Sequence, residues 1–109
     1  MTVIRNVLLV SVNKVGSLSN VRKVNLYRNA SSVAGDRAPD QVFLDADMRG
    51  PRKTYLDAAG TLYILDGDSP FSGGKQGCIY IYDHALDAPV LRARITTGLS
   101  WPQDFVVVE

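Results

Sequence analysis

The sequence predicts an all-β chain that contains two copies of one four-stranded unit. Short apolar runs rich in Val, Ile, Leu and Tyr recur along its 109 residues, and each run has the length and composition of a β-strand. Clusters of Gly, Pro, Ser, Asn and Asp separate the runs, and these residues favour turns. The second half of the chain repeats the strand pattern of the first, which predicts two similar units.

About eight strands follow from this pattern, and no helix is expected. A helix needs apolar residues at positions i, i+3, i+4 and i+7 over about three turns. Only Asp45–Tyr55 approaches that spacing, and Gly50-Pro51 interrupts it. The expected strands are residues 7–10, 24–27, 42–44, 54–56, 62–65, 79–82, 90–95 and 105–108.

Two offsets relate the halves of the chain. The earlier strands match 55 residues apart and the later ones 51 residues apart, because the loop at 29–40 is longer than its counterpart at 83–89. A repeat of about 50 residues with four strands has the size of one β-propeller blade, although any all-β chain has some self-similarity by chance. The matched segments are Val7–Val10 with Leu62–Leu65, Val24–Tyr27 with Ile79–Tyr82, Pro51 with Pro102, and Thr54–Leu56 with Phe105–Val107.

The segment Pro51–Asp83 resembles a blade of the NHL-repeat and gluconolactonase-like six-bladed β-propellers. Blades of these families contain a Pro, an apolar strand ending in Asp, a Gly turn, a Leu-Tyr-apolar-apolar-Asp strand, a Gly-rich loop and a further apolar strand ending near Asp. The resemblance implies two four-stranded propeller blades per chain and no particular activity. The counterpart at 7–27 keeps the strands and lacks both aspartates. The matching residues are Pro51, Tyr55-Leu56-Asp57, Gly60, Leu62 to Asp66, Gly73-Gly74 and Ile79 to Asp83.

The strand order within a blade predicts how the chain is divided. Propeller strands run a, b, c, d from the central channel outward, and Thr54–Leu56 falls at strand a. The chain would then begin at a strand b, Val7–Val10, and end at a strand a, Phe105–Val108. Strand a of one blade would therefore come from the C-terminus of another copy. The expected boundaries are 1–109 for the single two-blade unit and about 1–52 and 53–109 for its repeats.

Two blades do not close a ring, so the sequence predicts self-assembly. A single chain would leave two blade faces and unpaired strand edges in water, which favours association. Head-to-tail contacts form a ring when the rotation closes. We expect a homotrimer with six blades, the number that the family resemblance implies. A tetramer with eight blades, a dimer with four blades and a compact monomeric β-sandwich are the alternatives.

Composition excludes several classes of partner. The formal net charge is +1, which argues against a nucleic-acid binder that neutralises phosphates. One Cys and one His exclude an intrachain disulfide framework and a cysteine-based or paired-histidine metal motif within the chain. No apolar run approaches about 20 residues, and the N-terminus lacks the pattern of a signal peptide. We therefore expect a cytoplasmic protein without a nucleic-acid or membrane partner.

Candidate ligand-binding residues lie on the loops that would surround one mouth of the channel. Asp66 and Asp68 could offer hard oxygens to a divalent cation such as calcium, or could bond turn amides. Trp101 could stack on a flat ligand or pack over a neighbouring blade. Basic side chains near Arg52 could bind an anion or pair with surface acids. The candidates are Asn13, Arg49, Arg52, Asp66, Asp68, Lys75, Trp101, Gln103 and Asp104.

These patterns favour a binding protein over an enzyme. No nucleophile elbow, phosphate loop or dinucleotide fingerprint occurs, and no residue is assigned to catalysis. We expect a small homo-oligomeric propeller that acts as a ligand-binding or protein-interaction module and needs no cofactor. One alternative is a metal-dependent lactonase or hydrolase with its site at the channel mouth, and another is a module that acts through its outer rim. His84 and Cys78 are expected to be structural.

Overall fold

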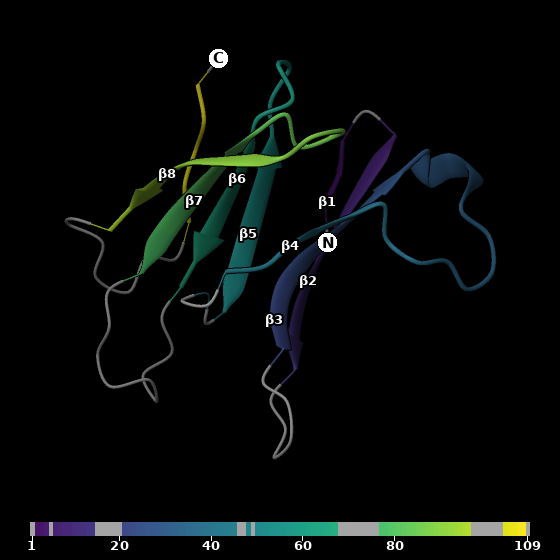
Figure 1. The fold of residues 1–109 in the computed structure, drawn as a ribbon, viewed down its shortest axis with the longest axis horizontal. Coiled ribbons are helices and arrows are strands. Elements are labelled where there is room, and N and C mark those ends of the chain that lie inside the picture. The colour runs from purple at the N-terminus through teal and green to yellow at the C-terminus, as the bar shows by residue number, and fades with distance from the viewer. Residues whose placement is uncertain are drawn as a thin grey trace.

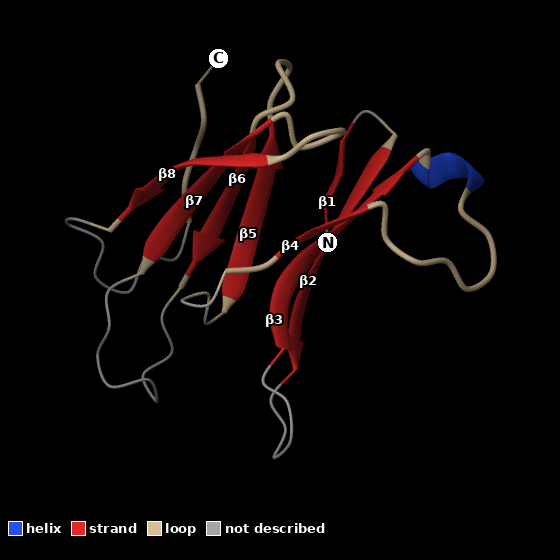
Figure 2. Cartoon of the chain, in the orientation of Figure 1, coloured by secondary structure: helices blue, strands red, loops and turns tan. Residues whose placement is uncertain are grey.

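The computed structural model of the chain describes residues 2–4, 6–14, 21–45, 48, 50–67, 77–96 and 104–108. In this part of the chain, eight strands form two four-stranded antiparallel sheets that lie side by side (Figure 1). One 3-10 helix, η1 (Ala30–Ser32), is the only helix among these residues (Figure 2). The prediction of an all-β fold is confirmed.

Each sheet is a meander, in which strands that follow one another in the sequence are hydrogen-bonded neighbours. This is the order that the sequence predicts for the second repeat. Sheet 1 contains β1 (Thr2–Ile4), β2 (Val7–Lys14), β3 (Val21–Arg28) and β4 (Gln41–Phe43). Sheet 2 contains β5 (Pro51–Leu56), β6 (Leu62–Asp66), β7 (Cys78–Asp83) and β8 (Val90–Ile95).

Sheet 1 obtains its first strand from its own chain, contrary to the expectation from the sequence. β1 pairs antiparallel with β2, with Ile4 opposite Val7. Asn6 lies in the tight connection with a φ of 61°, a left-handed conformation that Asn adopts more readily than most residues. The expectation that the chain begins at a strand b is therefore wrong, since β1 occupies the place that the C-terminus of another copy was expected to fill.

The C-terminal segment is extended but is not a strand, although the sequence predicts one at Phe105–Val108. Val106 and Val108 are 82% and 90% exposed, whereas Phe105 and Val107 are half-buried, so the alternation of a strand is present. No backbone–backbone hydrogen bond joins residues 104–108 to another described residue. The segment has the side-chain pattern of a strand without a neighbouring strand to pair with.

The two sheets correspond strand by strand. Their third strands, β3 and β7, end at Arg28 and Asp83, which are 55 residues apart, in agreement with the offset that the sequence predicts for these strands. With the third strands aligned in this way, the cross-strand pairs of one sheet fall on those of the other. The pairs Leu8–Tyr27, Val10–Asn25 and Val24–Phe43 of sheet 1 correspond to Leu62–Tyr82, Ile64–Tyr80 and Ile79–Ile95 of sheet 2.

This correspondence corrects the predicted offset of the second strands by one residue. Leu8, and not Val7, is the counterpart of Leu62, because Leu8 lies opposite Tyr27 as Leu62 lies opposite Tyr82. Successive side chains of a strand point to opposite faces of a sheet, so a shift of one residue exchanges the two faces. The corrected offset decides which faces of the two sheets are equivalent.

One face of each sheet packs against the other sheet and forms the core. The buried side chains from both sheets make one continuous apolar cluster. Phe43 of β4 crosses from sheet 1 to meet Tyr82 of β7, with ring centroids 4.9 Å apart and planes inclined at 67°. The main contributors are Val7, Leu9, Val24, Leu26 and Phe43 from sheet 1 and Leu56, Leu62, Ile64, Tyr80 and Tyr82 from sheet 2.

The opposite face of each sheet is mostly apolar, apart from Lys23 in sheet 1 and Lys53 in sheet 2, and packs against no other sheet within the described residues. Its residues alternate with the core residues along the same strands. Most of these side chains remain partly exposed, although Leu65, Ile81 and Asn25 are buried. We name outer face 1 the set Leu8, Val10, Val12, Lys23, Asn25, Tyr27 and Val42 of sheet 1, and outer face 2 the set Lys53, Tyr55, Tyr63, Leu65, Ile79, Ile81 and Ile95 of sheet 2.

Candidate functional site

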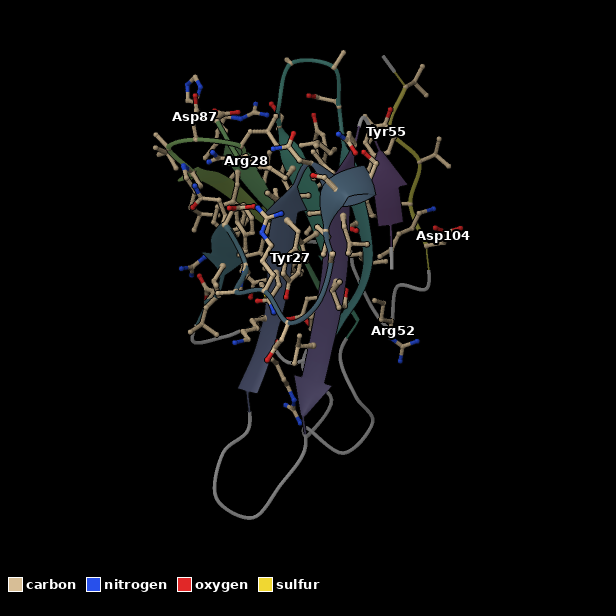
Figure 3. All side chains as sticks on the ribbon, turned by 90° about the vertical axis from the view of Figure 1, so that its right-hand side faces the viewer. Tyr27, Arg28, Arg52, Tyr55, Asp87 and Asp104 are labelled. Carbon is tan, nitrogen blue, oxygen red and sulfur yellow. The ribbon has the colours of Figure 1, made fainter. Side chains whose placement is uncertain are left out.

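The described candidate residues gather where β5 begins and β6 ends. Arg52 belongs to β5, and Asp66 closes β6 opposite Pro51. Asp104 reaches the same strand through an ion pair with Lys53. Figure 3 shows Arg52 and Asp104 on one flank of the molecule. We call this cluster the β5 site, and it consists of Arg52, Lys53, Asp66, Gly67 and Asp104.

Lys53 ties the C-terminal segment to β5. Its ammonium group forms an ion pair with Asp104 Oδ1 and donates to the carbonyl oxygen of Phe105 at 2.8 Å. The ammonium nitrogen also lies 5.3 Å from the centroid of the Phe105 ring, within cation–π range. Lys53 is therefore a paired cation, and Asp104 is its partner.

The carboxylate of Asp104 is stabilised as an anion. It accepts from Lys53 and, at 2.8 Å, from the backbone N–H of Phe105. The hydrogen bond from Lys53 is the main reason that the pKa of Asp104 lies below its ordinary value, and the Phe105 N–H adds to the effect. Because both partners of this carboxylate come from the chain itself, Asp104 acts here as an anchor for the C-terminal segment.

Asp66 is a buried structural carboxylate. Only 3% of the residue is exposed, and its Oδ1 accepts from the backbone N–H of Gly50 at 2.6 Å. The N–H of Gly67 donates in return to the carbonyl oxygen of Gly50 at 3.1 Å. These two bonds fasten the end of β6 to the residue that precedes β5. Of the two roles expected for Asp66, bonding of backbone amides is the one that these contacts support.

Arg52 of the β5 site is exposed, and its side chain passes over Gly67. A Cβ placed on Gly67 would lie 2.4 Å from Arg52 Cδ, so the aliphatic part of the arginine passes directly over the Gly67 backbone. The guanidinium end projects from the flank of the molecule (Figure 3). This arrangement holds a positive charge at the surface next to the loop that follows β6.

Most of the other candidates lie outside the described residues. Asn13 lies near the end of β2, and its backbone pairs with Arg22 of β3, but its side chain is not described. The structure therefore brings together three of the nine candidates, Arg52, Asp66 and Asp104. Whether the other six lie near them is not tested. The candidates outside the described residues are Arg49, Asp68, Lys75, Trp101 and Gln103.

The described residues provide no metal centre. No group of three or more His, Cys, Asp and Glu side chains is placed to hold an ion in the part of the chain that the structure covers. No helix among those residues has the length and apolar character that a membrane crossing requires. Chemically, the β5 site places the guanidinium group of Arg52 at the surface, and a guanidinium group is able to bind anions.

The two residues expected to be structural have structural surroundings. Cys78 is buried in the cluster between the sheets, and burial raises the pKa of its thiol. His84 is exposed, has a φ of 55°, and its carbonyl oxygen accepts from the N–H groups of Asp87 and Ala88 in a turn. Neither residue belongs to the β5 site.

Two polar residues with specific surroundings were not predicted to be important. The carboxylate of Asp57 organises the turn between β5 and β6, and its place in the blade-like motif is the signal that points to it. Asn25 lies on outer face 1 with its Oδ1 buried and without a hydrogen-bond partner among the described residues. The signal for Asn25 is an amide inside the apolar strand Val24-Asn25-Leu26-Tyr27.

Comparison with models of protein families, with curated proteins and with solved structures found no match for this chain.

Proposed function

We propose that the chain is a two-blade unit that assembles head-to-tail into a six-bladed β-propeller of three copies and acts as a ligand-binding or protein-interaction module. The observation that carries this proposal is the correspondence of the two sheets, which share strand order and cross-strand pairs and stack face to face. Two equivalent four-stranded sheets stacked in this way are what consecutive propeller blades require.

The two outer faces supply the reason to assemble. Within the chain, the contact between sheets buries one apolar face of each. Most side chains of outer face 1 and outer face 2 are apolar as well, and Val42 of outer face 1 is 46% exposed, whereas Leu65 of outer face 2 is already buried within the chain. Apolar faces left in water favour association through the hydrophobic effect. A neighbouring copy that repeats the internal contact would cover both faces at once.

The two outer faces differ from each other, so the contact between copies is head-to-tail. One face belongs to sheet 1 and the other to sheet 2, and a head-to-tail contact forms either a closed ring or an open filament. Because β1 fills the first position of sheet 1 within the chain, this closure needs no strand from another copy. The C-terminal segment that Lys53 of outer face 2 holds would form part of the contact. The resemblance to six-bladed families favours three copies.

The ring would place the β5 site at the channel. β5 corresponds to the innermost strand of a blade, so three copies of Arg52 would surround the axis. A ring of guanidinium groups attracts a ligand with several negative charges, or an acidic segment of another protein, more strongly than one group does. This is the function that we propose for the mouth of the channel.

The mass in solution tests the proposed assembly. Light scattering on a sizing column should give about 36 kDa, three times the 11.9 kDa of the chain. A mass of about 48 or 24 kDa would replace the six-bladed ring by an eight- or four-bladed one. A mass of about 12 kDa at all concentrations would contradict the proposal, because it would leave both outer faces in water.

A further inference from the structure

The contact between the two sheets of one chain contains a specific aromatic pair. Phe43, the last residue of β4, is 1% exposed and packs edge-on against Tyr82 of the next sheet, with centroids 4.9 Å apart. Phe43 pairs across its own sheet with Val24, and Tyr82 pairs with Leu62. The cross-strand partners of Phe43 and Tyr82 define the position of each residue in its sheet, so the equivalent position in the other sheet can be identified.

The same two positions recur on the outer faces. Ile95 pairs with Ile79 in sheet 2 as Phe43 pairs with Val24 in sheet 1, so Ile95 is the counterpart of Phe43. Tyr27 pairs with Leu8 as Tyr82 pairs with Leu62, so Tyr27 is the counterpart of Tyr82. Ile95 is 43% exposed on outer face 2 and Tyr27 is half-buried on outer face 1, which faces the viewer in Figure 3.

We infer that outer face 2 of one copy packs on outer face 1 of the next with Ile95 against Tyr27, and that this contact gives the buried Asn25 its hydrogen bond. The inference rests on the proposed self-assembly and specifies its interface. Its occupant is a second copy of this chain, because the internal contact between the sheets already provides a template for the pairing of these faces.

Asn25 gives independent support to a partner on outer face 1. It alternates with the core residues Val24 and Leu26 and lies between Val10 and Val42 in the sheet. The residue is 9% exposed, and its Oδ1 has no hydrogen-bond partner among the described residues. An unpaired buried acceptor destabilises a protein, and most buried polar groups have partners. A donor from the neighbouring copy removes this penalty only when the two faces meet.

Charge introduced at Ile95 tests the interface. Ile95→Arg should reduce the mass from about 36 kDa to about 12 kDa while the far-UV spectrum stays that of a β protein, because the side chain is partly exposed in the single chain and would be desolvated in the assembly. Ala88→Arg is the matched control, since Ala88 lies exposed in the turn before β8, and this variant should keep the wild-type mass.

Substitution of Asn25 tests the hydrogen bond. Asn25→Leu should raise the concentration at which the assembly dissociates by roughly five- to tenfold, because a donor in the interface loses its acceptor. The same change should leave the dissociated chain equally or more resistant to heat, since it removes an unpaired buried acceptor. Ser11→Ala, on the opposite face of β2, should change dissociation little.

The outcomes separate this inference from the proposed assembly. If the wild-type chain assembles and Ile95→Arg assembles equally well, Ile95 does not lie in the contact and the inferred pairing with Tyr27 is wrong, while a different register of the same two faces would still close the proposed ring. If Asn25→Leu assembles as tightly as the wild type, Oδ1 gains no hydrogen bond from the neighbouring copy, which overturns the role of Asn25. If the wild-type chain stays a monomer, the proposed assembly fails and the inference fails with it.

Discussion

Phe43→Ala is expected to lower the free energy of unfolding by about 3–5 kcal/mol, the typical loss for truncating a buried aromatic side chain. Phe43 is almost fully buried and is in direct contact with Tyr82 of the other sheet. The substitution removes the apolar area of the ring, leaves a cavity between the sheets and ends the edge-on ring contact. Urea unfolding followed by tyrosine and tryptophan fluorescence measures the loss at one fixed protein concentration.

Two variants complete this test. Phe43→Leu should lose less stability than Phe43→Ala, because it retains much of the apolar volume. Leu44→Ala is the control, since Leu44 follows Phe43 directly and is 62% exposed, and it should change stability by about 0.5 kcal/mol or less. Equal losses for Phe43→Ala and Leu44→Ala would show that Phe43 does not join the sheets as the structure describes.

Asp57→Ala is expected to destabilise the fold by about 2–4 kcal/mol through the turn between β5 and β6. Oδ1 of Asp57 accepts from the N–H groups of Ala59 at 3.0 Å and Thr61 at 2.9 Å, and Oδ2 accepts from the Tyr63 hydroxyl at 3.2 Å. Gly60 follows in a left-handed conformation with a φ of 86°. Removing the carboxylate leaves three donors without this acceptor.

The comparison with another turn aspartate isolates this effect. Asp87 is exposed, and among the described residues its side chain accepts only from the N–H of Ala88 at 2.9 Å, so Asp87→Ala should cost about 0.5 kcal/mol or less. Thermal unfolding of both variants measures the difference. A loss for Asp57→Ala no larger than that for Asp87→Ala would refute the role of the Asp57 carboxylate in fixing the hairpin.

The positions of most strands could be predicted from the sequence because their apolar content and length are clear. The residue-by-residue alignment of a strand in sheet 1 with its counterpart in sheet 2 could not be predicted. Val7-Leu8-Leu9-Val10 is apolar at every position, since both faces of sheet 1 are apolar. Such a run lacks the alternation of apolar and polar residues that reveals which side chains share a face. The one-residue error in aligning Val7 with Leu62 follows directly from this.

The errors at the two termini have different physical causes. β1 has only three residues and is joined to β2 through a tight turn at Asn6, so its sequence shows neither a long run nor a Gly or Pro signal. Residues 105–108 have the alternation of a strand, but pairing depends on a neighbouring strand that is distant in sequence. The alternation of side chains in a short segment indicates that the segment tends to be extended. It does not indicate which strand, if any, the segment pairs with.

The candidate site could be predicted only in part, because a residue type does not reveal which partner it finds. Asp66 and Asp104 are placed near one end of sheet 2, as expected for residues at equivalent strand ends. Whether an aspartate bonds a backbone amide, as Asp66 does with Gly50, or a lysine, as Asp104 does with Lys53, depends on contacts across 16 and 51 residues of sequence. These contacts exist only after the sheet has formed.

Chemical cross-linking between Tyr27 and Ile95 tests the central claim most directly. In a Cys78→Ser background, which removes the one native cysteine, the double variant Tyr27→Cys and Ile95→Cys carries one thiol on each outer face. Two stacked sheets separate these faces within a chain, and stacked sheets lie about 10 Å apart, so a short bis-maleimide should join different copies only. Each single-cysteine variant is a control, because its copies can be cross-linked only if the same outer face of two copies meets.

The head-to-tail ring predicts linked species of two and three chains on a denaturing gel, with the three-chain product as the upper limit and no product from either single-cysteine variant. Only single chains from the double variant, or two-chain products from a single-cysteine variant, would contradict the ring.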